Sequence, residues 1–435
     1  MAPETFASAG KKHEEFTQWA KDQGIQINGV AAVRFPGRGI GIAALRGIDA
    51  GETIVSVPTS SLLTLDKIPS TFREKFQGDT PVQGIFAAYL ACDDDARSRY
   101  APWRATWPTM RDFEDSIPLL WPKYLIGTPG DELKGQGETT GRGQEVFPSL
   151  LPPSISGHFN LSNRVGRFSG DYTPDHQNLL ENQRSRFRKA FSRVKLACPG
   201  INLEIFTYYW FATHTRCFFY VAKDSEVPED RNDAMALCPF ADYFNHSSND
   251  PGCKASFDGD GYTFTATKSY AKGEEVFVCY GNHTSDVLLT DYGFVPDENK
   301  WDAIFLDDIV LQDINKIKRR YLKEDNYLGN YQVTRAGPCF RTEVAASLTY
   351  MSVDDWSLYV GGTIPSSFDS EKTDRIVASW IRKYRDEADL AIARVEGMVR
   401  SGIYETANRL KSIILRWKQI RELCSVALDS LEPST

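Results

Sequence analysis

The spacing of hydrophobic and polar positions changes along the chain and separates strand-like from helix-like blocks. Residues 12–23 carry Phe16 and Trp19 three positions apart, which predicts a short amphipathic helix that ends at Gly24. In residues 27–58, small and β-branched residues alternate in short runs that Gly and Pro interrupt. This pattern predicts two or three short strands joined by tight turns.

Helical spacing dominates residues 80–235. Apolar residues recur every three or four positions in GIFAAYLACDD, ENQRSRFRKAFSRVKLAC and LEIFTYYWFATHTRCFFYV. Residues 128–153 interrupt this pattern and are rich in Gly, Thr and charge, which predicts a surface loop or an insertion. A helical block therefore separates two blocks of strands.

Strand character returns in residues 237–296. CKASFD and GYTFTAT flank Gly259-Asp260-Gly261 as a predicted hairpin, and residues 275–280 (EVFVCY) have the pattern of a half-buried strand. After Trp301 the chain becomes helical again, with amphipathic patterns over residues 369–399 and 404–428. The alternation of blocks predicts an α+β protein.

Length and composition narrow the functional classes. A chain of 435 residues with 41% hydrophobic residues exceeds one ordinary core and predicts two domains. Fifty basic and 58 acidic residues give a net charge of -8, so we expect no general binding to nucleic acid or to anionic membranes. A basic or neutral protein partner stays compatible with this charge.

Cysteines and the N-terminus bear on the compartment. The eight cysteines show no C-x-x-C spacing or close cluster, which favours reduced thiols inside the cell over zinc or disulfides. The first residues lack an apolar run, and no segment has the length of a membrane span. We therefore expect a soluble cytoplasmic or nuclear protein.

The glycines at 37, 39 and 41 suggest either a nucleotide-binding loop or a hairpin. A dinucleotide fingerprint needs a helix directly after it, whereas another turn follows here at residues 50–52. The alternative is a hairpin whose glycines adopt positive φ.

Asn245 and His246 lie between apolar segments. The amide of Asn245 can donate and accept fixed hydrogen bonds to a polar ligand. None of the six histidines has a metal partner at a suitable spacing, so we expect no metal site. His246 is then either a structural histidine bonded through both nitrogens or a proton shuttle.

Aromatic residues follow the strand of residues 275–280. Tyr280 precedes Gly281, which lets the backbone come close to a ligand. Tyr280, Tyr292 and Phe294 can wall a channel around an amine through cation–π attraction, or they can pack in the core.

A hydrolase is disfavoured. The chain has no G-x-S-x-G nucleophile elbow, and Asp242, four residues before His246, can cap a turn as readily as it can orient the imidazole.

Four segments together resemble the SET-domain protein lysine methyltransferases, in the branch similar to the Rubisco large-subunit methyltransferase. In chain order they are GIGIAALRGIDAGETIVSVP, FTYYWFATHTRCF, FADYFNHSS and CYGNHTSDVLLTDYGF. The last two carry the D-x-x-N-H-S-like turn and the Y-G then Y-G-F pair of that family. The resemblance implies a SET-type fold of short sheets over residues 15–300, split by a helical insert at about 80–235, and a helical substrate-docking domain over residues 301–435.

The resemblance also implies a cofactor, S-adenosylmethionine (AdoMet), and the residues that hold it. Backbone groups of Arg38, Gly39 and Ile40 take its methionine end. The other positions matching the cofactor site are Thr215, Asp242, Asn245, His246 and Tyr280.

The family pattern makes Tyr280 the active-site tyrosine and places Arg216, Tyr292 and Phe294 at the lysine channel. Two positions depart from it: Thr215 stands where relatives carry Ser, and Ser285 stands where many carry Asn.

The chemistry suits such a site. Methyl transfer from a sulfonium to an amine needs alignment and exclusion of water, not a metal. Free lysine has a pKa of about 10.4, and a dry aromatic channel beside a sulfonium lowers that pKa. Tyr280, a neutral phenol, would position the amine rather than act as a strong base.

The implied function is therefore transfer of methyl groups from AdoMet to lysine in a non-histone protein, such as a ribosomal protein or translation factor, with S-adenosylhomocysteine as product. The substrate would contact the helical insert and the C-terminal domain, and the enzyme would be a monomer. Two alternatives stay open: a catalytically inert SET-fold binding module, and a SET fold that methylates histidine or a small molecule.

Overall fold

The computed structural model describes residues 8–128, 147–159, 161, 172, 176–223, 225–402 and 407–431. The chain forms two compact units. The first consists of Met1–Phe113, Arg184–Asn282 and Glu298–Lys300, and the second consists of Glu114–Gln183, His283–Asp297 and Trp301–Thr435. Most of the predicted loop at residues 128–153 lies outside the described residues.

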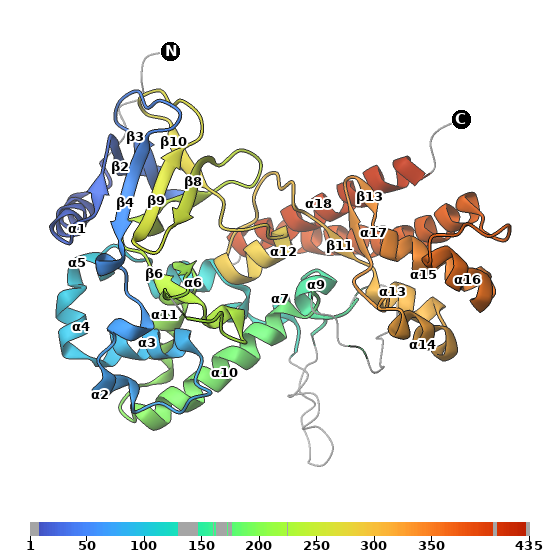
Figure 1. Cartoon of the computed structure of the whole chain (residues 1–435), viewed down its shortest axis with the longest axis horizontal. Helices are drawn as coiled ribbons and strands as arrows, with labels where there is room; N and C mark the ends of the chain where they lie inside the picture. Colours follow the sequence, from blue (N-terminus) through green and yellow to red (C-terminus); the bar gives the residue numbers. More distant parts are fainter. Residues whose placement is uncertain are drawn as a thin grey trace. The chain divides into compact units, whose positions relative to one another are not determined.

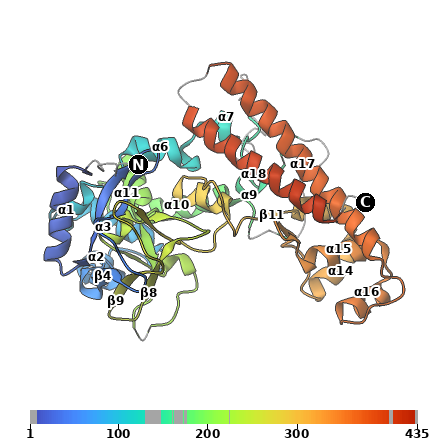
Figure 2. The same cartoon turned by 90° about the horizontal axis from the view of Figure 1, so that it is seen from above.

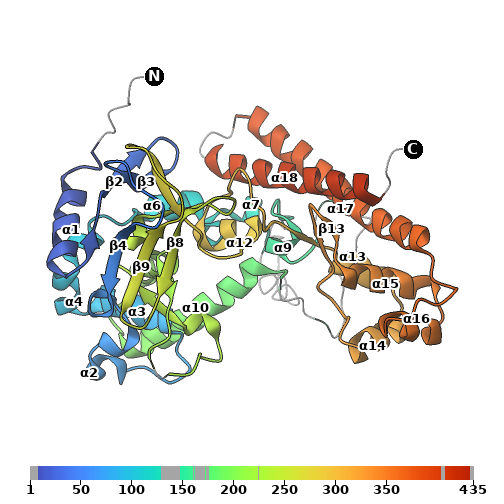
Figure 3. The ribbon, with the colours of Figure 1, turned by 45° about the horizontal axis from the view of Figure 1, so that its top comes forward.

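A mixed sheet forms the centre of the first unit, and its strands lie side by side in Figures 1 and 3. Their order is β1-β4-β9-β8-β10-β3-β2, with β7 also paired to β10. Strand β10 runs parallel to β7 and β8, whereas the other pairs are antiparallel. The strands are β1 (Gln26–Ile27), β2 (Val30–Phe35), β3 (Gly39–Ala44), β4 (Thr53–Pro58), β7 (Asn245–His246), β8 (Gly252–Phe257), β9 (Gly261–Ala266) and β10 (Glu275–Val278).

Strands from the two distant blocks alternate in this sheet. β4 pairs with β9 and β3 pairs with β10, so the first block cannot complete a sheet without the third. This pairing brings residues near 40 beside residues 245 and 275. It is the feature that assembles the candidate site.

Two predicted hairpins are confirmed. Strands β2 and β3 are joined through Gly37 and Gly39, with φ of 75° and 77°, values that glycine adopts at little cost. Because a strand and not a helix follows, the nucleotide-loop alternative is excluded. Strands β8 and β9 pair across Gly259, which has φ of 94°.

Helices complete the first unit. The predicted helix at 12–23 is α1, and its Phe16 is fully buried, stacked on Trp103 and edge-on to Tyr243. Gly84 of α3 allows a close helix approach, because a Cβ there would lie 3.1 Å from the Cβ of Ala190. The helices are α1 (Lys11–Asp22), α2 (Ser70–Arg73), α3 (Val82–Cys92), α4 (Asp94–Arg99), α5 (Ala101–Arg104) and α11 (Leu203–His214); α6 (Met110–Ser116) and α10 (Leu179–Ala197) each contain a boundary between the units.

The helical prediction for residues 203–221 is wrong at its C-terminal end. Helix α11 stops at His214, and β5 (Cys217–Phe219) pairs with β6 (Met235–Leu237). A short apolar run such as CFFYV fits either period, and strand pairing decides it here.

The second unit is mainly helical, and α17 and α18 run side by side in it (Figure 2). These helices confirm the long amphipathic patterns, and their buried aromatic residues include Trp380, Tyr384 and Trp417. The helices are α7 (Lys123–Ile126), α9 (Pro153–Ser156), α12 (Ser285–Val287), α13 (Asp307–Asp313), α14 (Lys316–Glu324), α15 (Phe340–Tyr350), α16 (Val353–Val360), α17 (Ser370–Arg400) and α18 (Ala407–Leu431). A small sheet of β11 (Ile304–Phe305), β12 (Gln332–Thr334) and β13 (Gly337–Pro338) was not predicted, because strands of two or three residues leave no periodic signal.

Candidate active site

The candidate site lies where β3, β7 and β10 meet in the first unit. Asn245 is opposite Phe277 and His246 is opposite Val278 in the parallel β7–β10 pair. On the other side of β10, Glu275 is opposite Ala43 of β3. Residues separated by about two hundred positions in sequence are therefore neighbours here.

One buried carboxylate connects the two halves of this site. The side chain of Glu275 is 4% exposed and accepts hydrogen bonds from Arg38 Nε at 2.8 Å and from Asn245 Nδ2 at 2.7 Å. A second guanidinium nitrogen of Arg38 lies 2.6 Å from the same carboxylate. Sequence reasoning missed Glu275, although an acidic residue that begins an otherwise apolar strand was a usable signal.

Gly41 leaves room for this contact. A Cβ at position 41 would lie 2.5 Å from Glu275 Oε1 and 2.6 Å from Asn245 Nδ2. By contrast, nothing lies within 4 Å of a Cβ placed on Gly39. Gly41 is thus needed so that Glu275 and Asn245 can pack together, while the face beside Gly39 is open.

Tyr280 is held at both its backbone and its hydroxyl. Its N–H donates to His246 Nδ1 at 3.0 Å, and its hydroxyl donates to the carbonyl of Phe244 at 2.6 Å. Burial raises the pKa of Tyr280 well above its ordinary value, so the phenol is neutral at physiological pH. The Tyr280 N–H thus accounts for one ring nitrogen of His246, and both alternatives for this histidine, structural residue and proton shuttle, stay open.

Asp242 pairs with an arginine and a tryptophan. Its Oδ2 accepts from Trp103 Nε1 at 2.9 Å and lies 3.6 Å from Arg216 Nε. Arg216 in turn donates to the Thr215 hydroxyl at 2.6 Å, and that hydroxyl donates to the carbonyl of Phe211 at 2.9 Å. Backbone N–H groups of Phe240 and Asp242 also interact with this carboxylate, which agrees with the turn-cap alternative, whereas Trp103 and Arg216 are partners that the sequence did not indicate.

Burial dominates the ionisation of this pair. It raises the pKa of Asp242 to about 6, although the nearby guanidinium of Arg216 opposes the shift. Burial also lowers the pKa of Arg216, although Asp242 opposes that shift. The carboxylate therefore titrates within an accessible pH range.

A pH dependence of stability follows from Asp242. Folded protein binds this proton more tightly than unfolded protein, so the stabilisation is complete below pH 3.8 and is lost as pH rises to about 6. The difference corresponds to about 3 kcal/mol, at about 1.36 kcal/mol per pH unit. Denaturant titrations between about pH 3 and pH 7, a window that spans both pKa values, should show wild type losing about this much unfolding free energy relative to Asp242→Asn. Parallel pH profiles of the two proteins would contradict the assignment.

Tyr292 and Phe294 belong to the second unit. Tyr292 ends a π-helical turn, Leu288–Tyr292, and its ring centroid lies 6.5 Å from that of Phe294 in an edge-on arrangement. The ring of His283 lies 6.2 Å from Tyr292. The two predicted channel residues therefore lie together, and their proximity to Tyr280 stays a prediction.

Two classes of feature are absent among the described residues. No group of three or more His, Cys, Asp or Glu side chains is arranged to hold a metal ion. No helix in the described ranges combines the length and apolar character needed to cross a bilayer.

Comparisons with known proteins agree with this architecture. The family model described as SET domain matches residues 39–281, more than half of the chain, and the model described as ribosomal lysine N-methyltransferase 2 C-terminal domain matches residues 302–430. The solved structure of Rubisco LSMT bound to AdoMet superposes with a TM-score of 0.56 at 15% identity, covering 97% of this chain and 93% of that one. This likeness confirms the predicted fold.

Curated relatives lie in the same family. SET domain-containing protein 4 of Homo sapiens is 22% identical over 440 residues, covering 96% of this chain and 90% of the human protein. Ribosomal lysine N-methyltransferase set11 of Schizosaccharomyces pombe is 27% identical over 211 residues, covering 46% of this chain and 54% of that protein. The SET-domain match covers most of the first unit's sequence and includes the junction of β3, β7 and β10. The chain therefore belongs to the SET-domain family.

Proposed function

We propose that this protein transfers methyl groups from AdoMet to a lysine side chain of a non-histone protein, and that a ribosomal protein is the first substrate class to test. One observation carries the proposal: Arg38, Asn245 and Tyr280, from two distant segments, meet at the β3–β7–β10 junction of a SET fold. Relatives named ribosomal lysine N-methyltransferases, set11 and the Saccharomyces cerevisiae enzyme 2, support the substrate class.

The residues at the junction fit AdoMet. The face beside Gly39 is open, its φ of 77° turns the backbone there, and the Arg38 side chain is 56% exposed next to it. We assign backbone groups of Arg38, Gly39 and Ile40 to the methionine end of the cofactor, and Asn245 and His246 to its adenine end. Thr215 and Asp242 support this site through Arg216. When bound, AdoMet supplies the methyl group on a positively charged sulfur.

Tyr280 is the proposed catalytic residue. A neutral hydroxyl, fixed by the Phe244 carbonyl, offers oxygen lone pairs at a defined place, where it aligns the acceptor nitrogen. It is not a general base, because burial raises its pKa. Loss of the lysine proton therefore depends on desolvation and on the cofactor charge.

The acceptor channel and docking regions complete the proposal. We assign Arg216, Tyr292 and Phe294 to the lysine channel, whose aromatic faces attract an ammonium and contact its aliphatic stem. We propose a SET domain over residues 15–300 with a helical insert at about 80–235, and a docking domain over residues 301–435. The insert and the docking domain together would bind the protein substrate of a monomeric, cytoplasmic or nuclear enzyme.

The test is methyl transfer to the proteins of a cell that lacks this enzyme. Purified protein and labelled AdoMet are incubated with extract from a deletion strain, and the labelled band is analysed by mass spectrometry. A methylated lysine in a ribosomal protein is the expected product. The actin-histidine N-methyltransferase of Canis lupus familiaris, 22% identical over 311 residues, makes histidine the specific alternative acceptor, and a methylated histidine would overturn the lysine assignment. No labelled band, together with no AdoMet binding by calorimetry, would support the inert module.

A further inference from the structure

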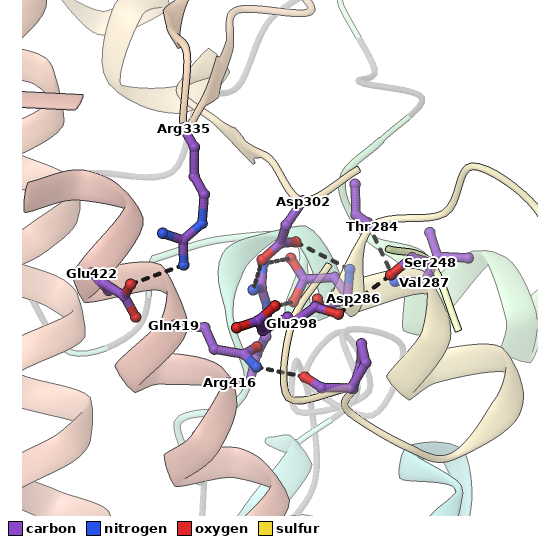
Figure 4. A network of polar contacts seen from close by, with 12 residues as sticks. Ser248, Thr284, Asp286, Val287, Glu298, Asp302, Arg335, Arg416, Gln419 and Glu422 are labelled. Carbon is purple, nitrogen blue, oxygen red and sulfur yellow. Dashed lines mark hydrogen bonds and ion pairs between the residues drawn. The ribbon is translucent and has the colours of Figure 1, made fainter. Parts of the chain in front are cut away.

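Arg416 of α18 is fully buried between two carboxylates of the second unit (Figure 4). Its Nε and Nη2 donate to the two oxygens of Asp286 at 2.7 and 3.1 Å, and its Nη1 donates to Asp302 Oδ2 at 2.5 Å. The other oxygen of Asp302 accepts the backbone N–H of Ser285 at 3.1 Å. The guanidinium of Arg416 thus binds carboxylates at both ends of the segment 285–302.

The charges of this cluster indicate that Arg416 fixes the positions of the two carboxylates and does not only stabilise the fold. Burial by itself lowers the pKa of Arg416, but Asp286 and Asp302 outweigh it and raise that pKa, so the arginine stays charged. Replacing a buried ion pair by apolar residues is often neutral or stabilising, so such a cluster is weak evidence for stability. A planar guanidinium fork instead fixes direction and distance at two carboxylates at once, which a lysine ammonium does not reproduce.

Gln419, one turn further along α18, holds the same segment at another point (Figure 4). Its Nε2 donates to the carbonyls of Pro296 at 2.7 Å and Asp297 at 3.3 Å. Tyr292 and Phe294 lie between the attachment points at Asp286 and Pro296. Helix α18 therefore binds the chain on both sides of these two aromatic residues.

The segment 285–302 contains little regular structure of its own. It contains α12 of three residues, one π-helical turn and Gly293 in a left-handed conformation with φ of 80°. A hydrogen bond from the Thr290 hydroxyl to the carbonyl of Asp286, at 2.8 Å, stabilises only the turn itself. Gln183 of α10 binds the middle of the segment, where its Nε2 donates to the carbonyl of Thr290 and to Asp291 Oδ1, each at 3.0 Å. The contacts to α18 hold its two ends.

We propose that Arg416 is a positioning residue of the active site. Through Asp286 and Asp302, and with Gln419 at the Pro296 end, it sets the conformation in which Tyr292 and Phe294 meet the acceptor side chain. This inference deepens the proposed function and rests on it. It also accounts for Ser285, because Asp302 accepts the backbone N–H of that position, which Ser supplies as well as Asn does.

The test uses the full-length variants Arg416→Lys and Gln419→Ala, with Arg335→Ala as the matched control. Arg335 also pairs with α18, through Glu422, but both side chains are more than half exposed. Rates are measured per mole of AdoMet-binding protein, so unfolded protein does not count. Amide hydrogen exchange is followed in peptides that cover residues 283–302.

We expect Arg416→Lys to lower kcat about tenfold or more, which is the scale of one lost hydrogen bond to a charged group. Gln419→Ala is expected to lower it about threefold, which is the scale of one lost neutral hydrogen bond. In both variants the Kd for AdoMet stays unchanged and exchange in residues 283–302 becomes faster, while Arg335→Ala matches wild type.

The outcomes separate this inference from the proposed function. Unchanged exchange in residues 283–302 in both variants overturns the positioning role. A kcat per mole of AdoMet-binding protein that stays at the wild-type value, together with a smaller AdoMet-binding fraction and faster exchange throughout the unit, also overturns it and leaves Arg416 structural. If wild type methylates no acceptor, the proposed function fails. The exchange experiment needs no substrate, so faster exchange confined to residues 283–302 in the variants would still support the conclusion that α18 sets the conformation of this segment.

Discussion

Replacing Tyr280 by Phe is expected to lower kcat for methyl transfer at least about 100-fold, or about 2.7 kcal/mol of transition-state stabilisation at about 1.36 kcal/mol per factor of ten. The substitution removes only the hydroxyl. In the wild-type protein this hydroxyl donates to the carbonyl of Phe244, which fixes its direction. The N–H of residue 280 still donates to His246, so we expect the Kd for AdoMet to change little. Single-turnover transfer from labelled AdoMet and calorimetry measure the two quantities separately.

Tyr270→Phe is the matched control for that experiment. Tyr270 is also buried, its hydroxyl also donates to a backbone carbonyl, that of Pro251 at 3.4 Å, and burial also raises its pKa. It should keep wild-type kcat. If Tyr280→Phe transfers methyl groups as fast as wild type, the phenol has no catalytic role.

Replacing Glu275 by Ala is expected to weaken AdoMet binding about 100-fold, or about 2.8 kcal/mol at 1.4 kcal/mol per factor of ten. The substitution removes the partner of Arg38 and of Asn245 in one step, and each lost contact is a charge-assisted hydrogen bond of about 1.5–3 kcal/mol. Both halves of the cofactor site would lose their common anchor. Calorimetry with AdoMet gives the change in Kd directly.

The neighbouring residue Glu274 supplies the control. Its side chain is exposed, and its carboxylate accepts the local backbone N–H of Ala271 at 2.9 Å. Glu274→Ala should therefore bind AdoMet like wild type. Equal affinity in Glu275→Ala and Glu274→Ala would show that the buried bridge is not needed for the cofactor.

The sequence predicted the local elements that have a clear period or a specific turn. Helix α1, the Gly37–Gly39 hairpin, the Gly259 hairpin and the amphipathic helices α17 and α18 all produce such signals. The residues after His214 were misjudged because a short apolar run fits both periods, and only its pairing with β6 makes it a strand.

The sequence named candidate residues for the site but not the contacts between them. Motif resemblance pointed to Arg38, Asn245 and Tyr280, yet nothing local indicated that Glu275 binds the first two, because that contact depends on the register of β10 against β3 and β7. The same limit applies to Arg416, whose partners lie more than a hundred residues away. Such contacts exist only once the tertiary structure has formed.

The pairing of β3 with β10 also has a consequence for how the protein folds during synthesis. The edge of the β2–β3 hairpin leaves the ribosome long before its partner strand, because residues 45–274 must be made in between. Closing so long a loop is slow compared with forming local helices, and an unpaired strand edge can associate with other chains meanwhile. We expect the cofactor site to be among the last parts of the first unit to form, after the insert helices.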